Sequence, residues 1–346
     1  MRMRARGRWT ASVGVLAAFV LVSGCAVERG LPVPSAEPEY VPVFEEPEPY
    51  ALAPLTGEQI EVGALTAPSL AAKVDNHPAA RPQVGLERTD IVFEELVEGG
   101  LTRYVAVWHS DVPDTIGPVR SIRPMDPDII SPLGGIVAYS GGQFRFVQMM
   151  LDTPVYNAIH GQADTEDTFF RGDNAISPHN VLVRAPQVIA QHRDRAAPPQ
   201  LFAFAESIAG ATATKEGAPT ERISLRFGSA SSPAWSWNAD SERWLRYMTG
   251  GALDTDSSGA PLSAVNVVTL RVPVQVIQDI PTTQLIGSGE GWVSTGGATI
   301  PVTWSKASMT APIRLLDEHG VTVRLAPGNS WVELVPLAGD VSFTRP

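Results

Sequence analysis

The chain has 346 residues, 44% of them hydrophobic, and a formal net charge of −11 at pH 7. Such an acidic chain argues against nonspecific binding to nucleic acid or to anionic lipid headgroups. Its one cysteine, Cys25, excludes an intrachain disulfide.

The first 24 residues have the organisation of a secretory signal. Four arginines precede an apolar run at residues 11–22, which is too short to span a bilayer as a helix, and small residues lead to Cys25. The pattern resembles a bacterial lipoprotein signal with its lipobox. The resemblance implies cleavage before Cys25, a diacylglyceryl group on its sulfur, and an anchor in the cell membrane on the extracytoplasmic side. An uncleaved signal with a free thiol is the alternative.

Residues 25–66 are predicted to be a disordered tether that starts at the lipidated cysteine. Prolines and glutamates alternate along it, and such a segment buries too little apolar surface to fold. Removing the four arginines of the signal takes the formal charge from −11 to −15, so the mature chain is more acidic still.

The remaining length predicts two domains. The first, residues 67–211, has strand signals at 70–74 and 136–139 and helix signals at 143–151 and 185–195. This alternation indicates an α/β domain with a mixed sheet. The fold class is therefore α+β or mixed, with a mainly β domain after the first.

The second domain, residues 220–346, is predicted to be all-β. Its apolar runs are short and bounded by Gly, Pro, Ser or Asp, which is typical of strands. These runs are 223–227, 244–247, 265–270, 292–294, 300–304, 313–316, 321–325 and 331–335. The tryptophans gathered here offer faces for stacking on sugars, but packing in the core is the commoner use of such residues.

A hairpin is predicted from two strand-like runs, 91–97 and 101–108. The Gly-Gly pair between them supplies the positive φ angles of a two-residue turn. We therefore predict an antiparallel pair that closes at Glu98 and Leu101.

This register places charged side chains together. It pairs Glu94 with Val105 and puts Glu94, Glu98 and Arg103 on one face, because side chains alternate along a strand. Arg103 could then bridge both carboxylates. A structural ion-pair network is the commoner outcome for such a cluster.

The segment GPVRSIRP, residues 117–124, forms a proline-bracketed turn that carries two arginines. Loops on a rigid sheet are where binding residues concentrate, and guanidinium forks match carboxylates and phosphates. A second arginine-bearing loop follows the first strand, at residues 75–82. The candidate anion-binding residues are Arg81, Arg103, Arg120, Ser121 and Arg123.

Other polar residues on the loops are candidates for catalysis or charge pairing. Asp75 follows the first strand, and His179 could orient toward the arginine loop, although loop histidines more often bond to backbone. The candidates are Asp75, Glu94, Glu98, His179 and Asn180.

Several ordered motifs together carry a family resemblance. DNHPAARPQ, EGGLTR, GPVRSIRP, SPHN, GSG, TWSK and PGNSW follow one another through nearly all of the chain after the tether. They resemble the YerB-like family of bacterial lipoproteins. The resemblance implies two adjacent domains of unknown function behind a lipoprotein signal, and it supplies no reaction and no catalytic residues.

Two functions from different classes remain open. The first is a membrane-anchored binding protein that captures an anionic envelope polymer or a protein partner through its arginines. The second is a hydrolase or transferase of envelope glycan or phosphodiester polymers, in which Asp75, Glu94 or Glu98 act with the arginines. The histidines lack zinc-site spacing, so we expect no metal, and we expect no cofactor and no nucleic-acid partner.

Overall fold

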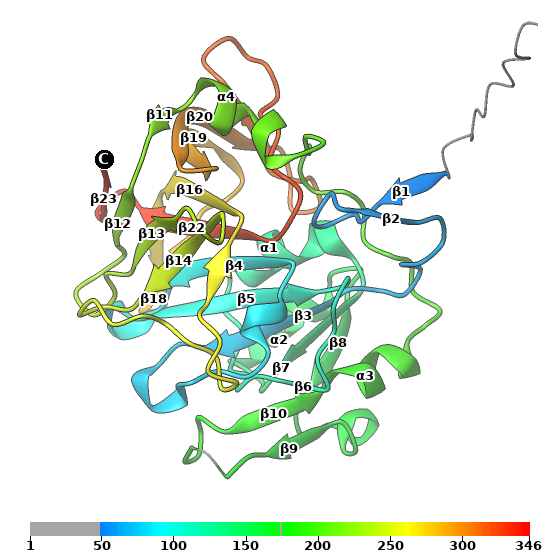
Figure 1. Ribbon diagram of the computed structural model, residues 1–346. Coiled ribbons are helices and arrows are strands. Elements are labelled where there is room, and N and C mark those ends of the chain that lie inside the picture. Colours follow the sequence, from blue (N-terminus) through cyan, green and yellow to red (C-terminus); the bar gives the residue numbers. More distant parts are fainter. Residues whose placement is uncertain (1–48, 174) are drawn as a thin grey trace, which may run out of the picture. The chain divides into compact units, whose positions relative to one another are not determined.

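The computed structural model describes residues 49–173 and 175–346, which belong to one compact unit (Figure 1). The predicted signal and the lipidated Cys25 lie outside the described residues. In the described ranges, none of the helices has both the length and the apolar character needed to cross a membrane.

A long mixed sheet organises this unit. Strand β22 (Ser330–Pro336) pairs in parallel with both β16 (Asn266–Val272) and β4 (Ile91–Leu96), so strands from the two predicted domains share one sheet. In Figure 1 the C-terminal strands lie above and the N-terminal strands below this junction. The mixed sheet of the N-terminal part and the mainly β C-terminal part confirm the predicted fold class. The division between residues 211 and 220 stays a prediction.

The remaining strands of the long sheet lie on either side of this centre. From one edge inward they are β11 (Ala218–Pro219), β20 (Ala298–Lys306) and β19 (Gly287–Thr295), with β21 (Arg314–Leu316) paired to β20. Beyond β4 follow β5 (Thr102–Trp108), β3 (Leu70–Asp75), β7 (Ile136–Tyr139) and β8 (Tyr156–Ile159).

Smaller sheets complete the strand inventory. A five-stranded antiparallel sheet has the order β15 (Ser263–Ala264), β14 (Arg243–Tyr247), β13 (Ala234–Asn238), β12 (Arg222–Arg226) and β23 (Asp340–Thr344). A three-stranded sheet has the order β6 (Thr115–Ile116), β10 (Val181–Arg184) and β9 (Phe169–Arg171). Two hairpins are β1 (Tyr50–Leu52) with β2 (Gln59–Glu61), and β17 (Val274–Ile277) with β18 (Ile280–Thr283).

Both faces of the long sheet are buried. On one face Phe93 and Val105 pack in a core that includes Phe146 of helix α2 (Phe144–Leu151). On the other face Tyr104 packs in a core that includes Trp235 of the five-stranded sheet. Strands covered on both sides are apolar almost throughout, so charged residues within them need partners. The other helices are α1 (Asp126–Ile130), α3 (Ala185–Gln191) and α4 (Thr212–Glu216).

Most predicted elements of the first domain are present. Strands β3 and β7 and helix α2 lie within a residue of the expected ranges, whereas α3 ends at Gln191. The predicted end of the tether at residue 66 is wrong, because β1 and β2 lie before it. Leu55, between these strands, is 1% exposed in the core and anchors this segment.

All but one of the predicted runs of the C-terminal half are strands, whereas β13, β15, β17, β18 and β23 were not predicted. Residues 321–325 form only isolated bridges, because their backbone groups bond to loops; for example, the Leu325 amide donates to the Ala203 carbonyl at 2.9 Å. Four tryptophans of this half are at most 1% exposed, which confirms core packing for them: Trp235, Trp244, Trp304 and Trp331.

Candidate functional site

The hairpin β4–β5 has a different register from the predicted one. Glu95 lies opposite Arg103, and Glu94 lies opposite Tyr104. The turn contains three residues, Glu98 to Gly100, rather than two, and the Val97 amide donates to the Leu101 carbonyl at 2.8 Å. A one-residue slip moves every side chain to the other face. The prediction that Glu94 shares a face with Arg103 is therefore wrong.

Both turn glycines adopt a φ of 71°. At Gly100 there is a second constraint, since an added Cβ would lie 2.8 Å from Ser229 Oγ and 3.1 Å from the Ser229 amide nitrogen. The close approach of the C-terminal half thus requires glycine at this position. This longer turn, with glycine in the left-handed region, sets the observed register.

One face of the sheet end carries most of the predicted site residues. Asp75, Arg103 and Glu95 lie side by side on β3, β5 and β4. A pocket of about 170 Å³ opens here, which we call the arginine pocket. Its lining residues are Asp75, His77, Val97, Glu98, Leu101, Thr102, Arg103, Arg120, Arg123 and His179.

Two of the three arginines in this pocket are paired with acids. Arg120 Nε lies 3.1 Å from Asp75 Oδ2. Arg123 forms a two-pronged ion pair with Glu98: Nη2 lies 2.7 Å from Oε1, and Nε donates to Oε2 at 2.9 Å. Glu98 is 40% exposed at the rim, whereas Asp75 is 3% exposed in the interior.

Arg103 is different from these two. Its Nη1 donates to the Ser121 carbonyl at 2.7 Å, and no acidic side chain of the described ranges lies within ion-pair distance of it. Burial, followed by the like charge of Arg123, lowers the pKa of Arg103 to about 10. The charges of Asp75 and Glu98 oppose the repulsion from the two neighbouring arginines, so the cost of burial dominates, and an anion bound to the guanidinium would offset this cost.

Asp75 also holds a histidine. Its Oδ2 lies 2.7 Å from His179 Nδ1, and its Oδ1 accepts from the His77 amide at 3.1 Å. The rings of His77 and His179 stack with their centroids 4.5 Å apart. The sequence-based expectation that His179 orients toward the arginine loop agrees with this geometry.

Three predicted site residues take other roles. Ser121 supplies its backbone carbonyl to Arg103 and does not line the pocket. Asn180 bonds to Arg171 at 2.8 Å, away from the pocket. Arg81 lies apart from the arginine pocket and pairs with Asp254.

A buried ion network is centred on Lys73, which lies two residues before Asp75 on β3. Lys73 is fully buried and pairs with Glu95 and with Asp126, the latter at 2.7 Å. Burial lowers the pKa of Lys73 to about 8, although Asp126 opposes this. The second oxygen of Asp126 accepts from the Arg123 amide at 2.6 Å, so the network fixes the arginine loop.

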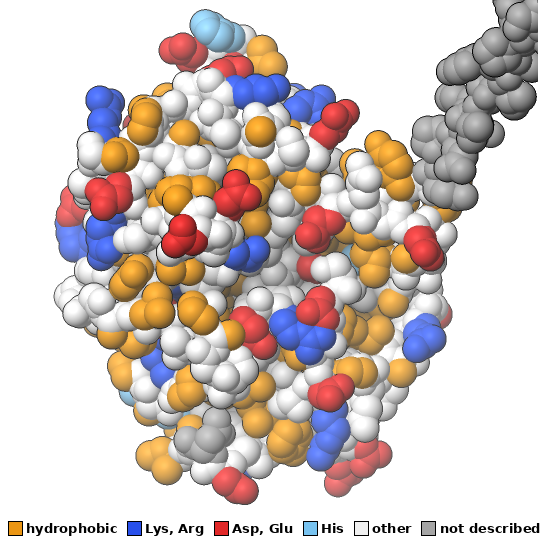
Figure 2. Space-filling view, in the orientation of Figure 1, with side chains coloured by type: hydrophobic (Ala, Val, Ile, Leu, Met, Phe, Trp, Pro, Cys, Tyr) orange, Lys and Arg blue, Asp and Glu red, His pale blue; other side chains and the backbone are white. Residues whose placement is uncertain are grey.

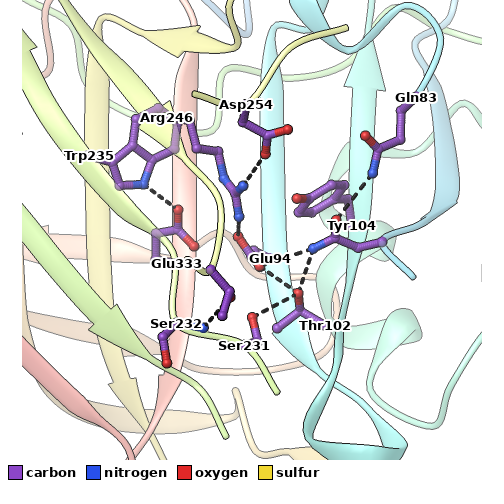
Figure 3. Close-up of polar contacts among 12 residues, drawn as sticks. Gln83, Glu94, Thr102, Tyr104, Ser231, Ser232, Trp235, Arg246, Asp254 and Glu333 are labelled. Atoms are coloured by element: carbon purple, nitrogen blue, oxygen red, sulfur yellow. Dashed lines mark hydrogen bonds and ion pairs between the residues drawn. The ribbon is translucent and has the colours of Figure 1, made fainter. Parts of the chain in front are cut away.

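The opposite face of the sheet holds a second arginine cluster (Figure 3). Arg246 on β14 is 1% exposed and pairs with Glu94 at 2.5 Å and with Asp254. Beside it, Glu333 accepts from Trp235 Nε1 at 2.7 Å. We call these five residues the Arg246 cluster.

Glu333 lies directly opposite Glu94 in the sheet, and both are fully buried. Burial, and then the charge of Glu94, hold the pKa of Glu333 well above its usual value. We did not predict this cluster from the sequence. Its only signal is Glu333 itself, a charged residue inside the apolar run SWVELVP, since such residues are rarely buried unless paired.

On the face shown in Figure 2, acidic and basic side chains are interspersed. In residues 49–173 and 175–346, the His, Cys, Asp and Glu side chains form no group of three or more suited to a metal ion.

The fold and the two clusters together describe the kind of protein to which the chain belongs. A long mixed sheet is shared by two chain segments, with a buried ionic centre on one face and a partly open cationic pocket at the strand ends. Two family models match these segments: the protein of unknown function (DUF3048) N-terminal domain at residues 55–215, and the DUF3048 C-terminal domain at residues 223–332. The chain belongs to this YerB-like family.

Two comparisons with individual proteins agree with this assignment. The chain is 25% identical over 309 residues to the "Putative lipoprotein YerB" of Bacillus subtilis (strain 168), covering 85% of this chain and 88% of that protein. A crystal structure of YerB protein from Bacillus subtilis superposes with a TM-score of 0.72 at 24% identity. That match covers 84% of this chain and 99% of the other, and it shows that the two proteins have the same fold.

Proposed function

We propose that the protein is lipid-anchored through Cys25 on the extracytoplasmic side of the membrane and that its arginine pocket binds an anionic group of a cell-envelope ligand. A carboxylate or a phosphate ester has the right chemistry for a guanidinium fork. The observation that carries the proposal is Arg103, a partly buried guanidinium next to two others and without an acidic partner among the described residues.

The charges around the pocket support the same proposal. The pocket is lined by three arginines and two carboxylates, and the carboxylates that offset the third arginine, Glu95 and Asp126, are both bound to the buried Lys73. A bound anion would complete the pairing of Arg103 and offset the repulsion from Arg123. Such a charge-assisted contact contributes roughly 1.5–3 kcal/mol, or about 10- to 150-fold in affinity.

The test is retention of the purified full-length protein on isolated anionic wall polymer. We expect Arg103→Leu, and likewise Arg120→Ala combined with Arg123→Ala, to lose at least about 10-fold in retention while remaining folded. Arg226→Ala is the matched control, because Arg226 pairs with Asp340 at the exposed surface. Unchanged retention of Arg103→Leu would contradict the proposal.

The anchor has its own support and its own test. The residues up to Cys25 have a lipobox pattern, and the Bacillus subtilis relative is named as a lipoprotein. Mass spectrometry of the membrane fraction should find a mature chain that begins with a diacylglyceryl-modified Cys25. A mature chain that begins elsewhere, or one that carries no lipid on Cys25, would refute the anchor.

A second candidate is a hydrolase or transferase, and the pairing of Asp75 with His179 favours it. If Nδ1 of His179 donates to Asp75, Nε2 carries the lone pair and is able to take a proton from an attacking water or hydroxyl. The arginines would stabilise the negative charge that develops on phosphorus oxygens. Glu94 has no part in this, because it faces the other side of the sheet.

Turnover of bis(p-nitrophenyl) phosphate tests this candidate. We expect His179→Asn to reduce turnover at least about 100-fold and to leave retention on wall polymer unchanged, since a general base acts on the reaction and not on anion capture. If the wild-type protein does not turn over the diester, or if His179→Asn is as active, the binding function stands alone.

A further inference from the structure

A second pocket adjoins the arginine pocket. It has a volume of about 210 Å³, and Leu101 and Thr102 line both pockets. The loop after β3 also contributes to both, since Asn76 and Pro78 line the second pocket and His77, between them, lines the first. The two pockets therefore share a wall.

The second pocket is lined by polar groups on its floor and is open at its rim. Asn76, Thr102, Ser231 and Arg246 are buried, whereas Pro78, Ala230 and Thr249 are exposed. Leu101, Pro233 and Met248 supply apolar surface. We call it the hydroxyl pocket, after Thr102, Ser231 and Thr249.

The charges in the hydroxyl pocket are already balanced. Arg246 pairs with Glu94 and Asp254, and Arg81 pairs with Asp254 and bonds to Asn76. Unlike the arginine pocket, it therefore offers no guanidinium without an acidic partner. A neutral ligand fits this balance better than an ion.

Two hydroxyls in the pocket have spare hydrogen-bonding capacity. Ser231 Oγ has one contact, with Thr102 Oγ1 at 3.4 Å, which is long for a bond between hydroxyls (Figure 3). Thr249 Oγ1 accepts from the Ser232 amide at 2.8 Å, and its own proton is still available to donate. Hydroxyl groups on a ligand could pair with both.

We infer that the two pockets together bind a phosphorylated sugar or polyol, with the phosphate in the arginine pocket and the neutral hydroxylated part in the hydroxyl pocket. This inference rests on the proposed anion-binding function and names its ligand class. The two pockets lie on opposite faces of the sheet and meet at Leu101 and Thr102, so a ligand that occupies both would pass around the start of β5.

Calorimetric titration of the full-length protein tests this inference. The probes are inorganic phosphate, glucose 1-phosphate and glycerol 3-phosphate. We expect at least one organic phosphate to bind about 10-fold more tightly than inorganic phosphate, because it adds two hydrogen bonds to the complex. The glucose and glycerol probes distinguish a sugar from a short polyol.

Variants separate the two pockets. Ser231→Ala combined with Thr249→Val should lose the added affinity for the organic phosphate and keep the affinity for inorganic phosphate. Ser232→Ala is the matched control, because Ser232 is an exposed neighbour that does not line the pocket. Arg103→Leu should lose binding of all three probes.

The failures are distinguishable. Equal affinities for inorganic and organic phosphate, or an organic increment that survives in the double variant, would overturn the inference and leave anion binding intact. If the wild-type protein binds no phosphate probe, the inference fails, and retention on wall polymer decides the proposed function separately.

Discussion

The arginine pocket and the Arg246 cluster lie on opposite faces of the same strand ends, and their arginines differ in pairing. Arg246 is 1% exposed and has two carboxylate partners, Glu94 and Asp254. Arg103 lies near two other arginines and has no carboxylate partner among the described residues. Arg246 is therefore directly paired with carboxylates, whereas Arg103 bonds only to a backbone carbonyl.

This difference assigns a structural role to the Arg246 cluster and a binding role to the arginine pocket. Glu94 belongs to the segment that matches the N-terminal family model, and Arg246 belongs to the segment that matches the C-terminal one. Their ion pair joins the two segments in the interior, where an unpaired charge is very costly. In the partly open pocket, Arg103 bonds to a backbone carbonyl and is instead able to bind an anionic ligand.

The largest effect is expected from Arg246→Leu. The substitution leaves Glu94 and Asp254 without their cation in the interior, and breaking a buried pair in this way costs about 3–5 kcal/mol. Chemical denaturation of the purified protein measures the loss in the free energy of unfolding.

The control for this prediction is Arg226→Leu. Arg226 and Asp340 form an ion pair with exposed side chains, at 47% and 70%, and surface pairs of this kind contribute about 0–1 kcal/mol. Equal losses of stability in the two variants would contradict the structural role of the Arg246 cluster.

A smaller, pH-dependent effect is expected from Glu333→Gln. Because the pKa of Glu333 is raised in the folded state, the native protein holds more protons than the unfolded chain above the unfolded pKa of about 4.5. Stability contributed by this group is therefore lost as pH rises. Glutamine retains an acceptor for Trp235 and does not titrate.

We accordingly expect Glu333→Gln to be similar to the wild type near pH 4.5 and more stable than the wild type at pH 8. Urea denaturation of both proteins across this range provides the measurement. A variant that becomes progressively less stable than the wild type as pH rises would mean that Glu333 is ionised and paired with Arg246.

Local patterns predicted the strands and the residues of the pocket better than they predicted its geometry. Strand β7 follows from short-range signals, whereas the pairing of Arg120 with Asp75 and of Arg123 with Glu98 was not predicted. The register of β4 and β5 does not follow from them either, because a three-residue turn with both glycines at positive φ takes the place of the two-residue turn that the Gly-Gly pair suggests. The Arg246 cluster is formed by residues from four strands and one loop in both halves of the chain, so no local spacing indicates it.

The smallest effect comes from the same substitution made on both faces. Glu98→Gln frees Arg123 from an ion pair at the rim, so we expect affinity for inorganic phosphate to rise up to about 5-fold with little change in stability. Glu94→Gln weakens a buried charged contact of Arg246 and should cost about 1.5–3 kcal/mol without any gain in affinity. Titration calorimetry and denaturation of both variants provide the measurements. Weaker phosphate binding by Glu98→Gln would mean that Glu98 positions Arg123 for the ligand and does not compete with it.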